Sequence, residues 1–175
     1  LSKAKTNKMN HTVELKDLKP GDHIYIWRGP FYQHHGIYVG DSKVIHFVQE
    51  SGSQTKSAIR ETSIETFIGE NTFCSNLKRV KYGVSRLEML VKRGGTCHTE
   101  SEADASEVIT RARERIGTAD YNLVSNNCEC FAVYCKTGKE EWSAQFKEKM
   151  LEGTMAFCAI IAVATIGIGI LAVKL

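Results

Sequence analysis

One hairpin constrains the fold of this chain more than any other feature. Residues 31–47 combine strand-forming side chains with a central Gly40-Asp41 pair that is typical of a tight turn, which predicts two antiparallel strands. His34 stands six residues before Gly40, and His46 stands six residues after it. Antiparallel pairing would therefore bring the two imidazoles close together across the ladder. One ring could then act as a base while the other orients it.

A cysteine far downstream supplies a matching nucleophile. Cys128 follows the polar pair Asn126-Asn127 and precedes the apolar run 131–135, a pattern that predicts a helix with Cys128 in its first turn. Free backbone amides and the helix dipole favour an anion there, so we expect a lowered thiol pKa. Taken alone, such a cysteine is more often a buried hydrophobic residue, and the two histidines are what favour catalysis.

Two segments of the chain resemble a known family. They are Tyr32-Gln33-His34-His35-Gly36-Ile37-Tyr38-Val39-Gly40 and Asn127-Cys128-Glu129-Cys130-Phe131. In the order His, His, Cys they resemble the lecithin:retinol acyltransferase family, a circularly permuted branch of the NlpC/P60 thiol-hydrolase superfamily, and most closely its plant NC-domain members. The resemblance covers roughly residues 13–140. Cys130 replaces the histidine or acidic residue usual in the family, and His35 stands where relatives often carry an aromatic residue.

The resemblance implies a fold and a set of site residues. The fold would be α+β, a circularly permuted NlpC/P60 (papain-like) arrangement in which helices pack on an antiparallel sheet. Cys128 would be the nucleophile, His34 the general base and His46 the residue that orients His34. Tyr32 and Asn127 would lie at the oxyanion or substrate-binding position. No cofactor is implied.

A metal site built from the same residue types is a weaker alternative. His34, His35, His46, Cys128 and Cys130 include the ligand types that zinc prefers. Adjacent residues on a strand face opposite sides, however, so His34 and His35 cannot both point to one ion. We therefore expect no metal. His11, His23 and His98 receive no role from the sequence.

The C-terminal part of the chain predicts membrane attachment. Residues 154–173 contain no charged residue and no proline, and at about 1.5 Å per residue they would cross the roughly 30 Å hydrocarbon core. Residues 141–153 carry apolar side chains among lysines and glutamates, as an interfacial helix does, although such a stripe also fits packing on the domain. The expected organisation is a catalytic domain over 13–140, an amphipathic linker over 141–153 and a single transmembrane anchor over 154–173. The domain would face the cytosol at an intracellular membrane.

The charge and the cysteine content limit the classes of binding partner and the redox state that this chain can have. A net charge of +3 without a concentrated basic stripe argues against nucleic-acid binding. The basic residues near the start and the middle of the chain fit either contact with anionic lipid or an ordinary solvated surface. Six cysteines in 175 residues are too few for a small disulfide scaffold and fit reduced thiols. No secretory signal is visible in the given residues, and a segment before Leu1 stays open.

Together these features predict a membrane-anchored cysteine acyltransferase or phospholipase A. It would act on glycerophospholipid acyl esters through an acyl-thioester, with an unknown acyl acceptor and a possible protein partner at the membrane. A thiol amide or isopeptide hydrolase on the same scaffold, or an inactive membrane adaptor, are the alternatives. Elsewhere the sequence predicts strands over 18–27 and 77–82 and helices over 85–92 and 104–116, the last with a capping box at Ser101-Glu102-Ala103-Asp104.

Overall fold

The fold is built on one antiparallel sheet of five strands, as seen in a computed structural model that describes residues 12–28, 32–49, 57–69, 77–122, 126–141, 143–144 and 146–154. The strand order is β4-β3-β2-β1-β5, and every neighbouring pair is antiparallel. The strands are β1 (His23–Trp27), β2 (Gln33–Gly40), β3 (Lys43–Gln49), β4 (Ser57–Ser63) and β5 (Lys78–Arg79).

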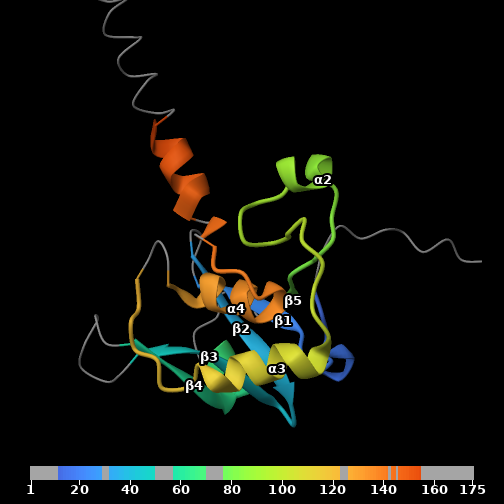
Figure 1. The fold of residues 1–175 in the computed structure, drawn as a ribbon, viewed down its shortest axis with the longest axis vertical. Coiled ribbons are helices and arrows are strands. Elements are labelled where there is room, and N and C mark those ends of the chain that lie inside the picture. The colour runs from blue at the N-terminus through green and yellow to red at the C-terminus, as the bar shows by residue number, and fades with distance from the viewer. Residues whose placement is uncertain are drawn as a thin grey trace, which may run out of the picture.

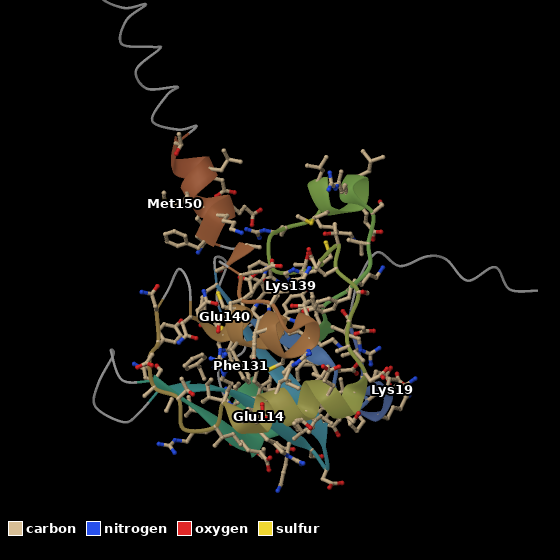
Figure 2. The ribbon with its side chains drawn as sticks, in the orientation of Figure 1. Lys19, Glu114, Phe131, Lys139, Glu140 and Met150 are labelled. Atoms are coloured by element: carbon tan, nitrogen blue, oxygen red, sulfur yellow. The ribbon has the colours of Figure 1, made fainter. Side chains whose placement is uncertain are left out.

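Helices cover both faces of this sheet. One face packs against α3 (Ala105–Glu114) and α4 (Cys128–Thr137), and Phe131 lies between α4 and the sheet (Figures 1 and 2). The other face packs against the short helix α1 (Ile64–Ile68), whose Phe67 joins a second apolar cluster. The remaining helices are η1 (Leu15–Asp17) and α2 (Arg86–Leu90). The predicted α+β class with an antiparallel sheet is confirmed, while the permuted connectivity and the domain boundaries stay predictions.

The predicted hairpin is formed by β2 and β3. Its turn places Gly40, Asp41 and Ser42 at positive φ, which Gly and Asp tolerate better than most residues. The turn lies at Asp41 and Ser42, one to two residues after Gly40, and with a register shift between Tyr38 and Gly40 the pairing puts Gly36, not His34, opposite His46. The two histidines are therefore diagonal neighbours on one face of the sheet, still within reach of each other.

The other predicted elements are found with shorter bounds, and three elements were missed, the shortest of which is η1. β1 and β5 lie inside the predicted strands, and α2 and α3 lie inside the predicted helices. The predicted capping box is wrong, because Asp104 is the N-cap of α3 and its side chain caps no amide. Strand β4 and helix α1 were not predicted.

The structure describes only part of the predicted membrane segments after α4. Helical turns run over 146–154, which covers most of the predicted linker and the first residue of the predicted anchor. The predicted anchor over 154–173 lies outside the described residues beyond Thr154. No helix in the described part of the chain is long and apolar enough to cross a membrane.

Candidate active site

Cys128 is the first residue of α4, as predicted, and Asn127 caps that helix. The Asn127 side-chain oxygen accepts hydrogen bonds from the amides of Glu129 (2.9 Å) and Cys130 (3.0 Å). The helix ends at Gly138, which has a left-handed conformation. These caps fix where the helix begins and so where the thiol lies. Asn127 is thus placed as a helix cap.

The thiol of Cys128 is buried against β2. Its side chain is 1% exposed, and its sulfur lies 3.4 Å from the Tyr32 hydroxyl and 3.8 Å from the Gln33 carbonyl oxygen. Burial raises the pKa of the Cys128 thiol, and the Tyr32 hydroxyl only partly opposes that effect. The expectation of a lowered thiol pKa is therefore wrong for this state, because the loss of water outweighs the helix terminus.

His34 and His46 form a direct pair, as the hairpin predicted. His34 Nε2 lies 2.9 Å from His46 Nδ1, and His46 Nε2 lies 2.8 Å from the Thr62 hydroxyl on β4. Phe67 stacks on the His34 ring and meets the His46 ring edge-on, with 5.1 Å between ring centroids in both cases. Gly36 leaves room for this packing, since a Cβ there would lie 3.0 Å from the Phe67 ring.

One tautomer assignment fits this chain of contacts. The Thr62 hydroxyl donates to the Ser63 carbonyl and can accept from His46 Nε2. His46 Nδ1 can then accept from His34 Nε2, which leaves His34 Nδ1 with a free lone pair. The Phe47 carbonyl, 3.0 Å from His46 Nδ1, becomes an acceptor when His46 takes up a second proton.

Both rings are neutral near pH 7. Burial, and then the neighbouring His46, hold the pKa of His34 well below its usual range. Burial lowers the pKa of His46 to about 4, against a smaller opposing effect of the Phe47 carbonyl. The described site thus combines a protonated thiol with unprotonated imidazoles.

A cavity of about 520 Å³ opens onto the histidines. Tyr32, His34, His46 and Tyr121 contribute to its wall. The Tyr121 side chain also forms a hydrogen bond with the Tyr32 side chain. Its ring packs edge-on against Phe47, with 5.1 Å between the ring centroids. Sequence reasoning missed Tyr121, whose position seven residues before Cys128 gives no local signal of the contact with Tyr32.

The structure brings the predicted residues together in two groups. His34 and His46 lie on the α1 face of the sheet, whereas Cys128 approaches β2 from the α4 face. Among the described residues, the sulfur interacts with the Tyr32 hydroxyl, the Gln33 carbonyl and the backbone of His35 and Glu129, and His34 is not one of its hydrogen-bond partners. Tyr32 links the groups, because it contacts the sulfur and lines the cavity beside the histidines.

Comparison with known proteins identifies the family. Residues 16–141 match the family model described as Lecithin retinol acyltransferase. The chain belongs to the lecithin retinol acyltransferase family. That match spans the sheet, the paired histidines and the whole of α4.

Three relatives show how far the similarity extends. Protein LEAD-SENSITIVE 1 of Arabidopsis thaliana is 38% identical over 159 residues, which cover 74% of this chain and 61% of that protein. Phospholipase A and acyltransferase 3 of Homo sapiens is 30% identical over 155 residues, covering 88% of this chain and 91% of the relative. Lecithin retinol acyltransferase of Rattus norvegicus is 25% identical over 142 residues, which cover 73% of this chain and 58% of the rat protein. The chain thus spans about three fifths of the Arabidopsis and rat proteins.

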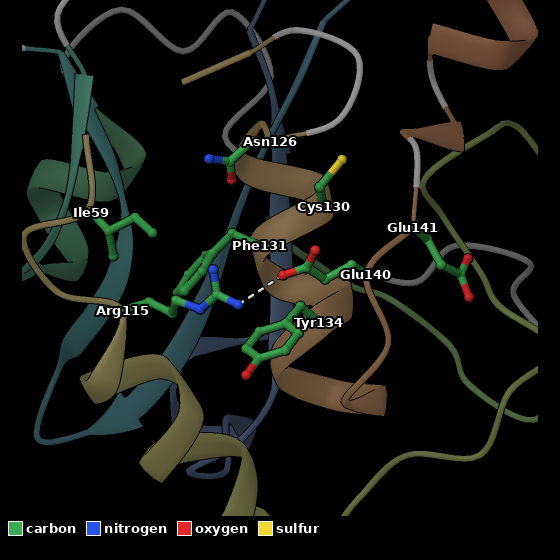
Figure 3. Close-up of a pocket in the computed structure, with 8 residues that line it drawn as sticks. All are labelled: Ile59, Arg115, Asn126, Cys130, Phe131, Tyr134, Glu140 and Glu141. Carbon is green, nitrogen blue, oxygen red and sulfur yellow. Dashed lines mark hydrogen bonds and ion pairs between the residues drawn. The ribbon is translucent and has the colours of Figure 1, made fainter. Parts of the chain in front are cut away.

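Cys130, which departs from the usual family residue, belongs to a different cavity. That cavity has a volume of about 260 Å³, and the Arg115–Glu140 ion pair (2.9 Å) crosses it (Figure 3). Burial raises the pKa of the Cys130 thiol to about 11. Cys97, Cys128, Cys130 and Cys135 are all free thiols. Cys130 is therefore not bonded to Cys128.

One group of residues in the described part of this family member has the spacing of metal ligands. A ring nitrogen of His98 and one carboxylate oxygen each from Glu100 and Glu141 lie within 4.8 Å of one another. Burial lowers the pKa of His98, the carboxylates of Glu129, Glu141 and Glu100 oppose that effect, and the Lys147 ammonium makes the smallest contribution. We assign this group no role in the proposed reaction.

Proposed function

We propose that this protein is a membrane-anchored cysteine acyltransferase or phospholipase A that acts on glycerophospholipid acyl esters. The observation that carries the proposal is the His34–His46–Thr62 chain, which opens into a cavity whose wall includes the tyrosine that contacts Cys128. The family supports the same chemistry, since relatives are named phospholipases A and acyltransferases.

The first half-reaction forms an acyl-thioester. His34 takes the thiol proton of Cys128 while the sulfur attacks the ester carbonyl carbon, which gives a tetrahedral oxyanion. The carbon–oxygen bond to the glycerol oxygen then breaks, and His34 returns its proton to that oxygen. His46 orients His34 and shares the positive charge of the imidazolium.

The second half-reaction frees the enzyme. Water, or an alcohol or amine acceptor, loses a proton to His34 as it attacks the thioester carbonyl, and the proton passes to the departing sulfur. Water yields a free fatty acid, and another acceptor yields an acylated product. Both outcomes use the same residues.

The oxyanion would be stabilised beside the sulfur. The Tyr32 hydroxyl already lies 3.4 Å from Sγ, and a backbone amide in the first turn of α4 would be the second donor. We propose that substrate binding rotates Tyr32 and brings His34 to the sulfur, since catalytic hydrogen bonds are often long in the free enzyme. Binding of this kind would also displace the contacts that now bury the thiol.

Membrane attachment supports the choice of substrate. The uncharged sequence over 154–173 would hold the domain at a bilayer facing the cytosol, where phospholipid acyl esters are concentrated. An amide or isopeptide hydrolase would use the same thiol. The buried thiol with its raised pKa favours a second candidate, an inactive adaptor, over that hydrolase.

The test is to trap the acyl-enzyme. Purified protein in detergent micelles is incubated with a phosphatidylcholine that carries a labelled acyl chain, and an adduct on Cys128 is sought by intact mass and peptide mapping. We expect an adduct that is lost in Cys128→Ser and reduced in His34→Ala, while Cys135→Ser, a buried control thiol, retains it. Folded protein with neither adduct nor released fatty acid would favour the adaptor.

A further inference from the structure

An exposed apolar tip projects from the domain at residues 86–91, here called the α2 tip. Leu87, Leu90 and Val91 are 77%, 80% and 81% exposed. No residue of α2 is buried, although the Ser85 side chain caps the helix by accepting from the Glu88 amide. A capped helix that leaves its largest apolar side chains in water gains nothing from packing, and such a patch is typical of an interaction surface.

The base of the α2 tip is tied to the rest of the domain at Gly94. The Gly94 amide donates to the Glu148 carboxylate (3.0 Å), and the Gly94 carbonyl accepts from the Gln33 side chain (3.2 Å). A Cβ on Gly94 would lie 2.7 Å from the Ala144 carbonyl oxygen, so the two backbones are in close contact. The tip is thereby fixed relative to the helical turns over 146–154 and to β2 beside the sulfur.

A second exposed apolar group lies at the same end of the molecule. Met150 and Leu151 are 58% and 65% exposed, and the turns that carry them project on the same side as α2 (Figures 1 and 2). From Thr154 the sequence continues without charge to Val173. The α2 tip and residues 146–154 therefore form one apolar end of the domain.

Basic residues border this end. Arg86 begins the tip, and Lys92 and Arg93 follow it, against one acidic residue in this stretch, Glu88. Residues 146–154 add two lysines and two glutamates. The Arg93 guanidinium lies over the Trp27 ring, 4.7 Å from its centroid. Apolar side chains bordered by lysine and arginine fit the interface of an anionic bilayer, where the apolar groups enter the acyl boundary and the cations meet headgroups.

We propose that the α2 tip inserts into an anionic phospholipid bilayer together with residues 146–154. The inference rests on the proposed function, because it names the surface through which the domain would meet its lipid. Gly94 and Gln33 connect this surface to the backbone that accepts the Cys128 thiol proton. Insertion would then orient the site toward the bilayer.

Depth-dependent fluorescence quenching tests the insertion on the full chain. Leu90→Trp and the control Ile116→Trp are bound to vesicles of dibrominated phosphatidylcholine, with and without phosphatidylserine, and the wild-type signal of Trp27 and Trp142 is subtracted. Ile116 is 43% exposed and comes two residues after Glu114. Glu114 lies at the opposite end of the molecule from Met150, so Ile116 should stay outside the membrane (Figure 2). We expect quenching of Leu90→Trp that increases with phosphatidylserine, and little for Ile116→Trp. Equal quenching of the two variants on both vesicle types would overturn the proposal.

A kinetic comparison separates this inference from the proposed function. Leu87→Ser/Leu90→Ser should lower acyl release from anionic vesicles by roughly tenfold, because it removes apolar area that enters the membrane. On a short-chain phosphatidylcholine below its micelle concentration, the same variant should match wild type. An equal loss on both substrates would contradict insertion, whereas inactive wild type on both substrates would contradict the proposed function alone.

Discussion

The resting state of Cys128 is a neutral thiol beside neutral imidazoles, not a thiolate–imidazolium pair. The terminus of α4, the Tyr32 hydroxyl and the His35 backbone stabilise the thiolate. Burial destabilises the thiolate by more, so the net effect is a raised thiol pKa. His34 does not take up a second proton near pH 7, because burial and His46 both disfavour its charged form. The proposed proton transfer from the sulfur to His34 therefore needs the substrate to change the environment of both groups.

Tyr32 is the residue whose removal should reveal this balance. Its hydroxyl helps to lower the Cys128 thiol pKa, so Tyr32→Phe should raise that pKa and slow alkylation by iodoacetamide at pH 7.5. A hydrogen bond to a charged group contributes about 1.5 kcal/mol or more, which corresponds to roughly tenfold in rate. Tyr134→Phe, in the separate cavity beside Arg115, is the control and should react at the wild-type rate. Faster alkylation of Tyr32→Phe would show instead that the ring mainly shields the sulfur.

Helix α4 depends on a single side chain for its start. Asn127→Ala removes both hydrogen bonds to the amides of Glu129 and Cys130 and should lower the free energy of unfolding by about 1 kcal/mol. Urea denaturation measures the change. Asn127→Asp retains the acceptor and should recover most of the stability. If both variants are equally destabilised, the cap is not the cause.

The β2–β3 hairpin depends on the missing side chain at position 36. In Gly36→Ala the new Cβ would lie 2.6 Å from a methyl group of Val44 and 3.0 Å from the Phe67 ring. Both neighbours are buried, so the substitution should destabilise the fold by about 1–3 kcal/mol and loosen the ring that stacks on His34. Gly153→Ala is the control, because among the described residues no atom beyond its own helical neighbours lies within 4 Å of the new Cβ. An unchanged urea midpoint for Gly36→Ala would mean that Phe67 moves aside at little cost.

Local patterns were enough to predict the elements that carry the three proposed catalytic residues. The Gly40-Asp41 turn gave the hairpin, and Asn127 with the apolar run behind it gave α4. Strand β4 was missed because Arg60, Glu61 and Thr62 interrupt the apolar pattern, although its backbone pairs fully with β3 and Thr62 completes the histidine chain. The burial of Cys128 and its contact with Tyr32 depend on segments 96 residues apart, which no local pattern encodes.

Buried histidines link the stability of the whole molecule to pH. His23, His34, His35 and His46 are all buried, and burial is the main cause that lowers the pKa of each, to about 4 for His35 and His46. His23 and His35 share a hydrogen bond of 2.8 Å. Converting both rings to imidazolium would therefore place two cations in contact. The folded protein therefore resists protonation of these rings.

The sign of the effect follows from proton binding in the two states. An unfolded histidine takes up a proton as the pH falls through about 6.5, while the folded one does not until a much lower pH. The unfolded chain thus binds more protons between pH 6.5 and about 4, and each such histidine costs up to about 1.4 kcal/mol of stability per pH unit.

We expect the urea midpoint to be constant from pH 7 to about 8, below the range where unfolded cysteine thiols titrate, and to fall steeply from pH 6.5 to 5, above the range where unfolded carboxylates titrate. Calorimetric unfolding in buffers of different ionisation enthalpy should count more than one proton taken up per molecule at pH 5.5, because several rings titrate together. His35→Gln keeps a polar side chain in the pair with His23 and should take up about one proton fewer. A midpoint that stays level from pH 7 to 5 would show that these rings take up protons in the fold as readily as in the unfolded chain, and that their burial is less complete than their contacts indicate.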